Sequence, residues 1–362
     1  MKKTTLLAGT AKGLIVFEEG AGGWHIRDVH FVGLPANYVY VHPFSGAWWV
    51  SLAHEHWGQK LHCSSDQGRS WREVAPPHYP QGAEIRPGRP ASLKKIWAIH
   101  HAGPENEGAL WVGTEPGGLF YKGPRDAHFH LNTALWEHPS RCDAQQWFGT
   151  GRSLPFLHSI VVDPRDSRHI YIAVSCAGVF ESRDGGESWL PRNEGLIAAY
   201  LPNPHVEIGH DPHRLLACEA RPEVLWQQNH CGIFRSVNGG ASWQDVSEPE
   251  GIARYGFALA IDPANPDRAW VIPAISDELR IAPGMALCVC RTEDGGKFWQ
   301  VLRNGLPQAH CFDIVFRHAL ASDGERLAFG STTGNLFFSP DAGDHWHCLH
   351  GHLARVDCVS FG

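Results

Sequence analysis

Short runs of alternating apolar and polar residues recur along the chain, with turn-forming residues between them. The clearest group lies between residues 156 and 196, with runs at His158–Val162, His169–Val174 and Gly178–Ser182 and a fourth that begins at Trp189. Runs of this length, rich in β-branched and aromatic residues and bounded by Gly, Pro and Asp, are typical of strands. The pattern predicts a unit of four consecutive strands, which we call A, B, C and D. Asp-Pro pairs, among them Asp211-Pro212, are expected in the turn between strands A and B.

A turn motif separates strands C and D, and it occurs five times. In four copies a hydroxyl residue is followed by Asp or Asn two positions on, Gly two further and Trp three beyond that; the first copy lacks one spacer. The Asp or Asn side chain can accept hydrogen bonds from the turn's N–H groups, and the Gly can adopt a left-handed conformation. Each copy therefore predicts a hairpin. The copies are residues 65–71, 182–189, 236–243, 292–299 and 339–346.

The spacing of these motifs predicts repeated units. The last four copies have their Asp or Asn at 184, 238, 294 and 341, at intervals of 54, 56 and 47 residues. Asp66 and Asp184 are 118 residues apart, so one degenerate copy is expected between them. A period near fifty with strands in every unit is typical of a propeller, because one such unit cannot bury its own faces.

In these motifs the chain resembles the Asp-box (BNR) repeat β-propellers. That family includes sialidases, xyloglucanases, sortilin-type receptors and photosystem II assembly factors. The resemblance rests on the S/T-x-D/N-x-G-x-x-W pattern and extends over the whole chain. Since the motif lies on the outside of the propeller in that family, away from the ligand face, the resemblance implies a structural role for the five copies and does not specify a function.

The four-strand template predicts an all-β fold, a single seven-bladed β-propeller over residues 1–362. Residues 1–32 supply three strands of one blade, and residues 353–362 have the pattern of its missing strand A. The C-terminal strand is therefore expected to join the N-terminal blade and close the ring, which removes an open sheet edge. The other six blades are expected at residues 38–75, 93–138, 156–196, 204–248, 254–306 and 310–349.

Composition and charge restrict the class of partner. The formal net charge is −7, which argues against nucleic acid, and no apolar run approaches the length of a membrane span. The N-terminal apolar stretch stops after a few residues and Lys12 follows, so we interpret it as a strand and expect a cytoplasmic protein. The ten cysteines contain no C-x-x-C pair and are expected to be mostly reduced.

The predicted topology puts the long loops on one side of the ring, opposite the turn motifs, and long loops on a rigid scaffold often carry binding sites. The chain has 24 histidines, so we expect a His-rich pocket for a small polar molecule or glycan at the mouth of the central channel. The alternative is a channel lined by polar groups that ordered water hydrates. The long loops are residues 75–92, 139–156, 219–231 and 273–285. The predicted ligand-binding residues are Lys95, Arg254, His54, His56, Trp226, Asn229 and His230.

A divalent metal at the channel mouth is one specific hypothesis. His158, His205 and His310 begin strands A of different blades in the template, so their imidazoles are expected to converge. Convergent imidazoles with a carboxylate nearby suit a transition metal. No local spacing such as H-E-x-x-H supports the site, so the hypothesis depends on the topology alone.

Glycoside hydrolysis is a second hypothesis, and it comes from the family resemblance. It requires two carboxylates on either side of a glycosidic bond. The sequence departs from the sialidases, because Ile85-Arg86-Pro87 lies in a crossing loop, and from the xyloglucanases, whose cleft lies between two propellers. The predicted catalytic residues are Glu207, Asp313 and Glu115, with Glu55 and Glu223 as further candidates.

The sequence thus predicts a protein that binds a small polar ligand, with glycosidase-like or metal-assisted hydrolase or lyase chemistry. A different class remains open, a non-catalytic scaffold or assembly factor that holds a protein partner on the loop face. A deep polar mouth favours the enzyme, whereas a broad apolar patch favours the scaffold. The residues expected in such a patch are Trp57, Trp136, Trp147, Phe148 and Trp226.

Overall fold

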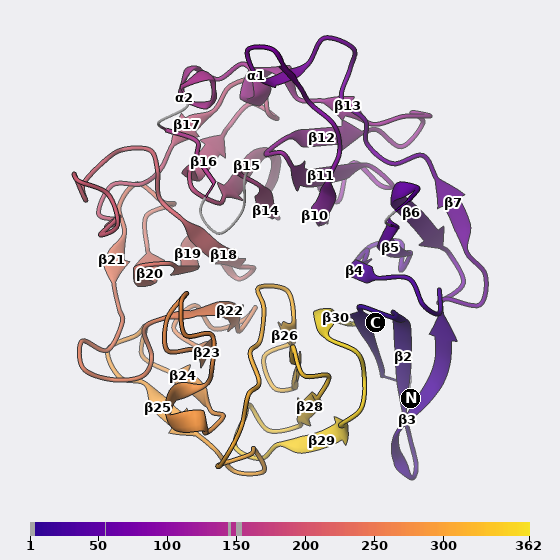
Figure 1. Cartoon of the computed structure of the whole chain (residues 1–362), viewed down its shortest axis with the longest axis vertical. Coiled ribbons are helices and arrows are strands. Elements are labelled where there is room, and N and C mark those ends of the chain that lie inside the picture. Colours follow the sequence, from indigo (N-terminus) through magenta and orange to yellow (C-terminus); the bar gives the residue numbers. More distant parts are fainter. Residues whose placement is uncertain (1–3, 55, 144–145, 150–153) are drawn as a thin grey trace.

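The chain forms a ring of seven four-stranded antiparallel sheets around one axis (Figure 1). The computed structural model describes residues 4–54, 56–143, 146–149 and 154–362. Within these residues helical structure is limited to α1 (Thr133–Trp136), α2 (Pro139–Cys142) and the 3-10 turn η1 (Pro283–Met285). The predicted all-β, seven-bladed propeller is confirmed.

In each blade one strand, the inner strand, lies beside the axis, and the strand at the other edge of the sheet lies at the rim (Figure 1). From the axis outward, the first four blades are β30 (Val356–Phe361), β1 (Thr5–Thr10), β2 (Gly13–Gly20) and β3 (Gly23–His30); β4 (Ala36–Val41), β5 (Trp48–His54), β6 (Gly58–Ser64) and β7 (Arg72–Val74); β10 (Lys95–His101), β11 (Leu110–Glu115), β12 (Leu119–Lys122) and β13 (His130–Leu131); and β14 (Leu157–Asp163), β15 (Asp166–Val174), β16 (Gly178–Ser182) and β17 (Leu190–Pro191). The other three are β18 (Pro212–Cys218), β19 (Arg221–Asn229), β20 (Gly232–Ser236) and β21 (Gln244–Asp245); β22 (Gly256–Ile261), β23 (Ala269–Pro273), β24 (Val289–Thr292) and β25 (Gln300–Leu302); and β26 (Leu320–Ser322), β27 (Leu327–Gly330), β28 (Leu336–Ser339) and β29 (His347–His350). A small hairpin, β8 (Glu84–Arg86) with β9 (Arg89–Pro90), lies outside these sheets.

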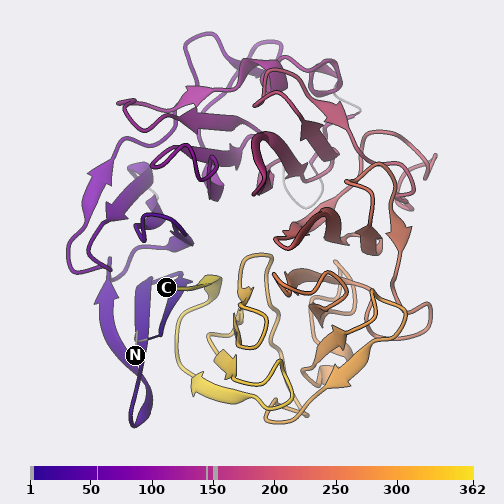
Figure 2. The ribbon, with the colours of Figure 1, turned by 180° about the vertical axis from the view of Figure 1, so that it is seen from behind.

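The C-terminal strand closes the ring, as the sequence predicted. Strand β30 pairs antiparallel with β1, so that Leu6 lies opposite Phe361 and Ala8 opposite Val359. The two ends of the chain consequently belong to one sheet, which is visible from both sides of the molecule (Figures 1 and 2). This pairing satisfies the backbone groups of β1 that would otherwise form an exposed edge.

The core lies between neighbouring sheets, and the tryptophans of the turn motifs connect one blade to the one before it. Trp243 is buried, and its indole N–H donates to the carbonyl of Arg192 at 2.8 Å. Trp299 is also buried and donates to the carbonyl of Val246 at 2.8 Å. Each ring therefore adds apolar area to the interface and keeps its polar N–H bonded.

The turn motif has the same hydrogen bonds in several copies, and the second copy shows them well. The hydroxyl of Ser182 donates to Asp184 Oδ1 at 2.8 Å and accepts from the N–H of Gly186 at 2.8 Å. Asp184 Oδ1 also accepts from the N–H of Ser188 at 2.9 Å. Gly186 has a φ of 91°, the left-handed region that glycine adopts without strain.

The strands of blade five differ from the sequence template. The template placed Asp211-Pro212 in the turn between strands A and B, whereas Pro212 begins the inner strand β18. The turn falls instead between Cys218 and Arg221, and the predicted loop 219–231 is mostly strand β19. The prediction was wrong because an Asp-Pro pair is typical of a turn, whereas here the Asp211 side chain accepts a hydrogen bond from Ser175 of the preceding blade. Asp211 therefore lies at the opposite end of the inner strand.

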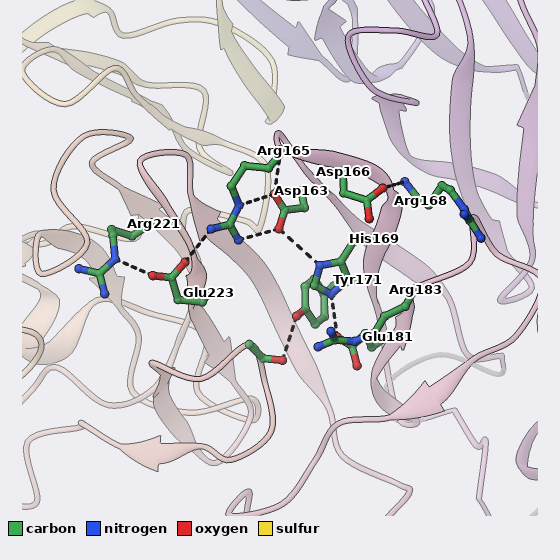
Figure 3. Close-up of polar contacts among 11 residues, drawn as sticks. Asp163, Arg165, Asp166, Arg168, His169, Tyr171, Glu181, Arg183, Arg221 and Glu223 are labelled. Atoms are coloured by element: carbon green, nitrogen blue, oxygen red, sulfur yellow. Dashed lines mark hydrogen bonds and ion pairs between the residues drawn. The ribbon is translucent and has the colours of Figure 1, made fainter.

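Glu181 on β16 is the centre of a polar network on blade four (Figure 3). Its carboxylate is buried and accepts hydrogen bonds from His169 Nε2 at 2.7 Å, Arg183 Nε at 2.9 Å and Arg192 Nε at 2.6 Å. Burial opposes the ionisation of Glu181, but these hydrogen bonds outweigh it and lower its pKa to about 2. The network therefore stabilises the ionised carboxylate inside the blade.

The same network extends to blade five (Figure 3). Arg165 binds Asp163 Oδ2 at 2.9 Å and Glu223 Oε2 on β19 at 3.2 Å. The hydroxyl of Tyr171 donates to the carbonyl of Gly239 at 2.9 Å. Polar contacts thus supplement the apolar packing between these two blades.

The described residues contain no helix with the length and apolar character needed to cross a membrane.

Substitution of Ser182 by Ala is expected to lower the midpoint of urea-induced unfolding. It removes the acceptor of the buried Gly186 N–H, a loss of about 1–3 kcal/mol in the free energy of unfolding. Tryptophan fluorescence would measure the midpoint.

The hydroxyl of the first motif is that of Ser64, which donates to Asp66 Oδ1 at 2.7 Å and accepts from the N–H of Gly68 at 2.8 Å, so this copy begins at Ser64 and lacks no spacer. Ser65→Ala is therefore the control: Ser65 is exposed, and its substitution is expected to change the free energy by less than about 0.5 kcal/mol. Equal midpoints for the two variants would contradict a stabilising role for the Ser182 hydroxyl.

Protonation of Glu181 is expected to lower the free energy of unfolding in acid. Its pKa is about 2 in the folded chain against an ordinary value of 4.5, so its contribution is complete above pH 4.5 and is lost as the pH falls toward 2. Glu181→Gln is expected to be less stable at neutral pH and to show a flatter dependence of unfolding free energy on pH in this range. Glu187→Gln, at an exposed position of the same turn, should retain the wild-type slope.

Candidate functional site

A cavity of about 650 Å³ lies between blades five and six, at the strand ends opposite the turn motifs. The β19–β20 turn, the crossing into β22 and the segment after β23 form its walls. Its lining includes two phenols, an imidazole, a thiol and a guanidinium, so it combines aromatic surface with a few polar groups. These residues are Tyr200, Tyr255, His230, Cys231 and Arg254.

Asp211, His213 and His230 bring three metal-ligating groups together beside this cavity. Their ligand atoms all lie within 4.8 Å of one another. Among the described residues, this is the one group of three or more His, Cys, Asp or Glu side chains that could hold a metal ion. Asp211 and His213 are on either side of Pro212 at the start of β18, so the alternation of a strand directs both side chains to one face. His230 directly follows the neighbouring strand β19, and its backbone N–H donates to the backbone carbonyl of Asp211 at 2.9 Å.

The distances within this group suit a bound ion better than direct hydrogen bonds. Asp211 Oδ2 is 3.5 Å from His213 Nε2 and 3.6 Å from His230 Nδ1. Direct bonds between such atoms are about 2.7–3.2 Å long. Two ligands bound tetrahedrally at about 2.0–2.1 Å from zinc are about 3.3–3.4 Å apart. The two distances from Asp211 are therefore close to those between ligands of one ion, and the ligand atoms of the two histidines lie within 4.8 Å of each other.

Hydrogen bonds behind the ligands orient two of them. His213 Nδ1 contacts the carbonyl of Gly256 at 2.6 Å, and because a carbonyl only accepts, this nitrogen carries the proton. Burial lowers the pKa of His213, so its ring is neutral and its Nε2 presents a lone pair to the site. The hydroxyl of Ser175 donates to Asp211 Oδ1 at 2.6 Å, which leaves Oδ2 for the site. Such outer contacts are typical of metal ligands in proteins.

Asp211 is buried, and its charge needs a positive partner. Burial opposes its ionisation, but Arg317 and the hydrogen bond from Ser175 favour the charged form and help to hold its pKa below the ordinary range. The carboxylate is therefore ionised at neutral pH and can bind a cation together with the imidazoles of His213 and His230.

Tyr255 adds a polar group that has no protein partner. Its hydroxyl is buried and makes no hydrogen bond in the described part of the chain. Its ring lies edge-on to His213 and to His230, with both centroid distances 5.7 Å. Burial raises the pKa of Tyr255, so the phenol keeps its proton and can donate to a ligand in the cavity.

Among the predicted ligand-binding residues, His230 and Arg254 line the cavity. Trp226 and Asn229 do not, because both are fully buried on strand β19 rather than in the loop that the sequence suggested. The Trp226 indole donates to the carbonyl of Pro266 at 3.1 Å, and the Asn229 amide donates to Gln227 Oε1 at 3.1 Å.

The other three predicted ligand-binding residues lie in blades two and three. His54 Nδ1 accepts from the N–H groups of His56 and Trp57, both at 3.1 Å, so the imidazole stabilises the tip of a turn. The ammonium of Lys95 lies 3.8 Å from the centre of the Trp97 ring at the inner strand β10. None of these three residues lines the cavity between blades five and six.

The three histidines predicted as metal ligands are not brought together. His158 is fully buried, with Nδ1 3.0 Å from the Ser159 hydroxyl and Nε2 2.8 Å from the carbonyl of Pro212. His205 and His310 are exposed in crossing segments, because the inner strands of their blades begin later in the chain, at Pro212 and Leu320. The template misplaced both strands and therefore both imidazoles.

The predicted catalytic carboxylates are also separated. Glu115 is 6% exposed in blade three and accepts from the Trp97 indole at 3.1 Å. Asp313 is buried in blade seven and accepts from Thr333 Oγ1 at 2.6 Å and Asn335 Nδ2 at 2.8 Å. Glu207 is exposed in the crossing before β18. Of the further candidates, Glu223 belongs to the network of Figure 3, and Glu55 lies outside the described residues.

Two residues of the site were missed by the sequence analysis, Asp211 and His213. Their D-x-H spacing places two ligands on one face of a strand, but the adjacent proline was interpreted as a turn. The correct register of β18 would have revealed them.

The predicted apolar patch does not form. Trp136, Trp147 and Trp226 are buried, whereas Trp57 is 74% exposed. The aromatic residues that were expected to hold a protein partner are therefore mostly part of the core.

Comparisons with known proteins support the fold alone. No protein-family model matches the chain, and no curated protein matches it. Similar solved structures include an ancestral GH74 enzyme, which is 14% identical with a TM-score of 0.59; the match covers 99% of this chain but only 40% of that enzyme. A proposed 6-phosphogluconolactonase from Bacteroides uniformis is 11% identical, with a TM-score of 0.59 and complete coverage of both chains. YCF48 from Cyanidioschyzon merolae is 13% identical, with a TM-score of 0.55 and coverage of 93% and 89%.

His158→Ala is expected to destabilise the protein without removing a metal. The substitution leaves a cavity and an unbonded carbonyl at Pro212, which together lower the free energy of unfolding by about 2–4 kcal/mol. His310→Asn is the control, since position 310 is exposed and has a φ of 52°, which Asn tolerates. Urea unfolding would measure both variants. A loss of bound metal in either variant would instead support the ligand set predicted from the sequence.

Proposed function

We propose that this protein is a metal-assisted hydrolase or lyase that acts on a small polar molecule in the cavity between blades five and six. The observation that carries the proposal is the convergence of Asp211, His213 and His230 beside that cavity, with ligand atoms within 4.8 Å of one another. One carboxylate and two imidazoles are a ligand set found in catalytic zinc sites.

A divalent ion held by these residues would supply an activated water or polarise a substrate oxygen. The residues themselves have separate tasks. Ser175 and the carbonyl of Gly256 orient the ligands, and Asp211 provides the negative charge that attracts a cation. The three protein ligands leave room for a further ligand, which is characteristic of catalytic rather than structural sites.

Two groups in the cavity can bind and orient a substrate. The hydroxyl of Tyr255 keeps its proton and has no protein acceptor, so it can donate to a substrate oxygen. The guanidinium of Arg254 is at the wall, where Nη1 donates to the carbonyl of Pro249 at 2.7 Å and holds the side chain in place. The rings of Tyr200 and Tyr255 offer flat apolar surface beside these donors.

This geometry favours metal-assisted chemistry over the two alternatives from the sequence. The carboxylates proposed for glycoside hydrolysis are in separate blades, and Glu115 and Asp313 are hydrogen-bonded within the protein. A scaffold function remains the second proposal, and YCF48 has been solved bound to D1 peptide. The apolar patch expected for that function is largely buried here.

Metal analysis of the purified, tag-free protein is the decisive experiment. After equilibration with Zn²⁺ and desalting, we expect one equivalent per chain by elemental analysis. The double variant His213→Ala/His230→Ala is expected to retain none. Ser175→Ala keeps the ligands but loses the bond that orients Asp211, and its affinity should fall by about 10–100-fold.

The matched control is the double variant His54→Ala/His56→Ala, which removes two imidazoles from a distant turn and should bind metal as the wild type does. Hydrolysis of a panel of small esters and lactones, lost on chelation and restored by Zn²⁺, would support the proposed activity. Absence of stoichiometric metal in the wild-type protein would reject the proposal.

A further inference from the structure

A second group of polar side chains surrounds the axis of the propeller, apart from the cavity. Arg214 on β18 and His318 just before β26 are in contact, with Arg214 Nη1 2.5 Å from His318 Nδ1. The ring of Tyr38 on β4 lies edge-on to His318 with centroids 4.9 Å apart. These three residues come from blades two, five and seven, which meet at the centre of the ring (Figure 1).

The contact with Arg214 determines the tautomer of His318. A guanidinium only donates, so His318 Nδ1 must accept and the ring proton must be on Nε2. The imidazole is neutral, because burial and the nearby Arg214, His158, Arg317 and Lys95 hold its pKa well below the ordinary value. His318 is 6% exposed, and its Nε2 has no hydrogen-bond partner in the described residues.

Arg214 also has a buried donor that lacks a hydrogen-bond acceptor. Its Nε is buried and has no partner among the described residues. Two buried donors, Arg214 Nε and His318 Nε2, thus lack acceptors within one pair of contacting side chains. A buried donor without a hydrogen bond is destabilising, so both atoms require an acceptor that the described chain does not supply.

The Arg214 guanidinium brings a positive charge to this pair, and it forms no ion pair with a carboxylate among the described residues. Lys95 and Arg317 are also close enough to lower the pKa of His318, in addition to the effect of its burial. The guanidinium of Arg317 lies 5.1 Å from the centre of the Phe156 ring and 5.4 Å from that of Phe257. Water could satisfy a donor, but it would not offset charge, whereas an oxyanion does both.

We propose that the axis of the propeller contains a binding site for a small oxyanion, the carboxylate or phosphate group of a small molecule. Arg214 and His318 donate to it, and the Arg214 guanidinium supplies the positive charge. Neither residue lines the cavity or belongs to the group of three metal-ligating residues. The site is therefore distinct from the cavity and does not depend on the proposed activity.

The test is the binding of inorganic phosphate and of acetate to the full chain by isothermal titration calorimetry in a low-salt buffer. We expect saturable binding of at least one of the two anions, with a rise in melting temperature at saturating anion. Binding of phosphate alone would identify a phosphate ligand, and binding of acetate alone a carboxylate ligand. Saturable binding of neither would overturn the proposal.

Two variants locate the site. Arg214→Gln/His318→Ala removes both donors and should weaken binding at least about tenfold, since it removes two charge-assisted hydrogen bonds to the anion. Arg214→Lys keeps the charge and the fold but loses the Nε donor, so it should bind with intermediate affinity. Arg69→Gln, at an exposed arginine outside this region, is the charge-matched control and should bind as the wild type does.

Protein treated with a chelator separates this site from the proposed metal centre. We expect unchanged anion binding after the metal is removed, even if every esterase and lactonase assay is negative. Loss of anion binding on metal removal would place the anion on the metal and overturn the axial site. Wild-type affinity in folded Arg214→Lys and in the double variant would also overturn it.

Discussion

The packing of one sheet against the next is the constraint on which the whole structure depends. A four-stranded blade has two largely apolar faces, and it can bury both only between two neighbours. The pairing of β30 with β1 gives the first blade its missing inner strand and leaves no blade at an open end. Two tryptophans of the turn motifs, Trp243 and Trp299, each strengthen an interface with one ring and one hydrogen bond.

Closure of the ring also explains why polar chemistry gathers near its centre. The inner strands converge there, so residues far apart in the chain become neighbours: Arg214 and His318 are 104 positions apart. The ends of the same strands carry Asp211 and His213 to the mouth beside His230. One strand, β18, thus contributes to both proposed sites, through His213 in the one and Arg214 in the other.

The repeated turn motif made the fold predictable, because each copy has local chemistry that marks one hairpin, as Ser182 and Asp184 illustrate. The site was only partly predictable. His230 was identified from a loop and Arg254 from the start of a strand A, and both line the cavity. Asp211 and His213 were missed because an Asp-Pro pair has the same local pattern in a turn as at the start of a strand. Distinguishing them required the contact with Ser175, which comes from another blade.

The closing strand also affects how the chain can fold during synthesis. Strand β1 ends at Thr10, whereas its partner β30 begins only at Val356, so nearly the whole propeller must emerge from the ribosome before the two can pair. Contacts with such separation in sequence are slow to form because they close a very long loop. Until then β1 presents unpaired backbone groups to other nascent chains. A chaperone that covers this strand would therefore protect an edge that stays open until synthesis is nearly complete.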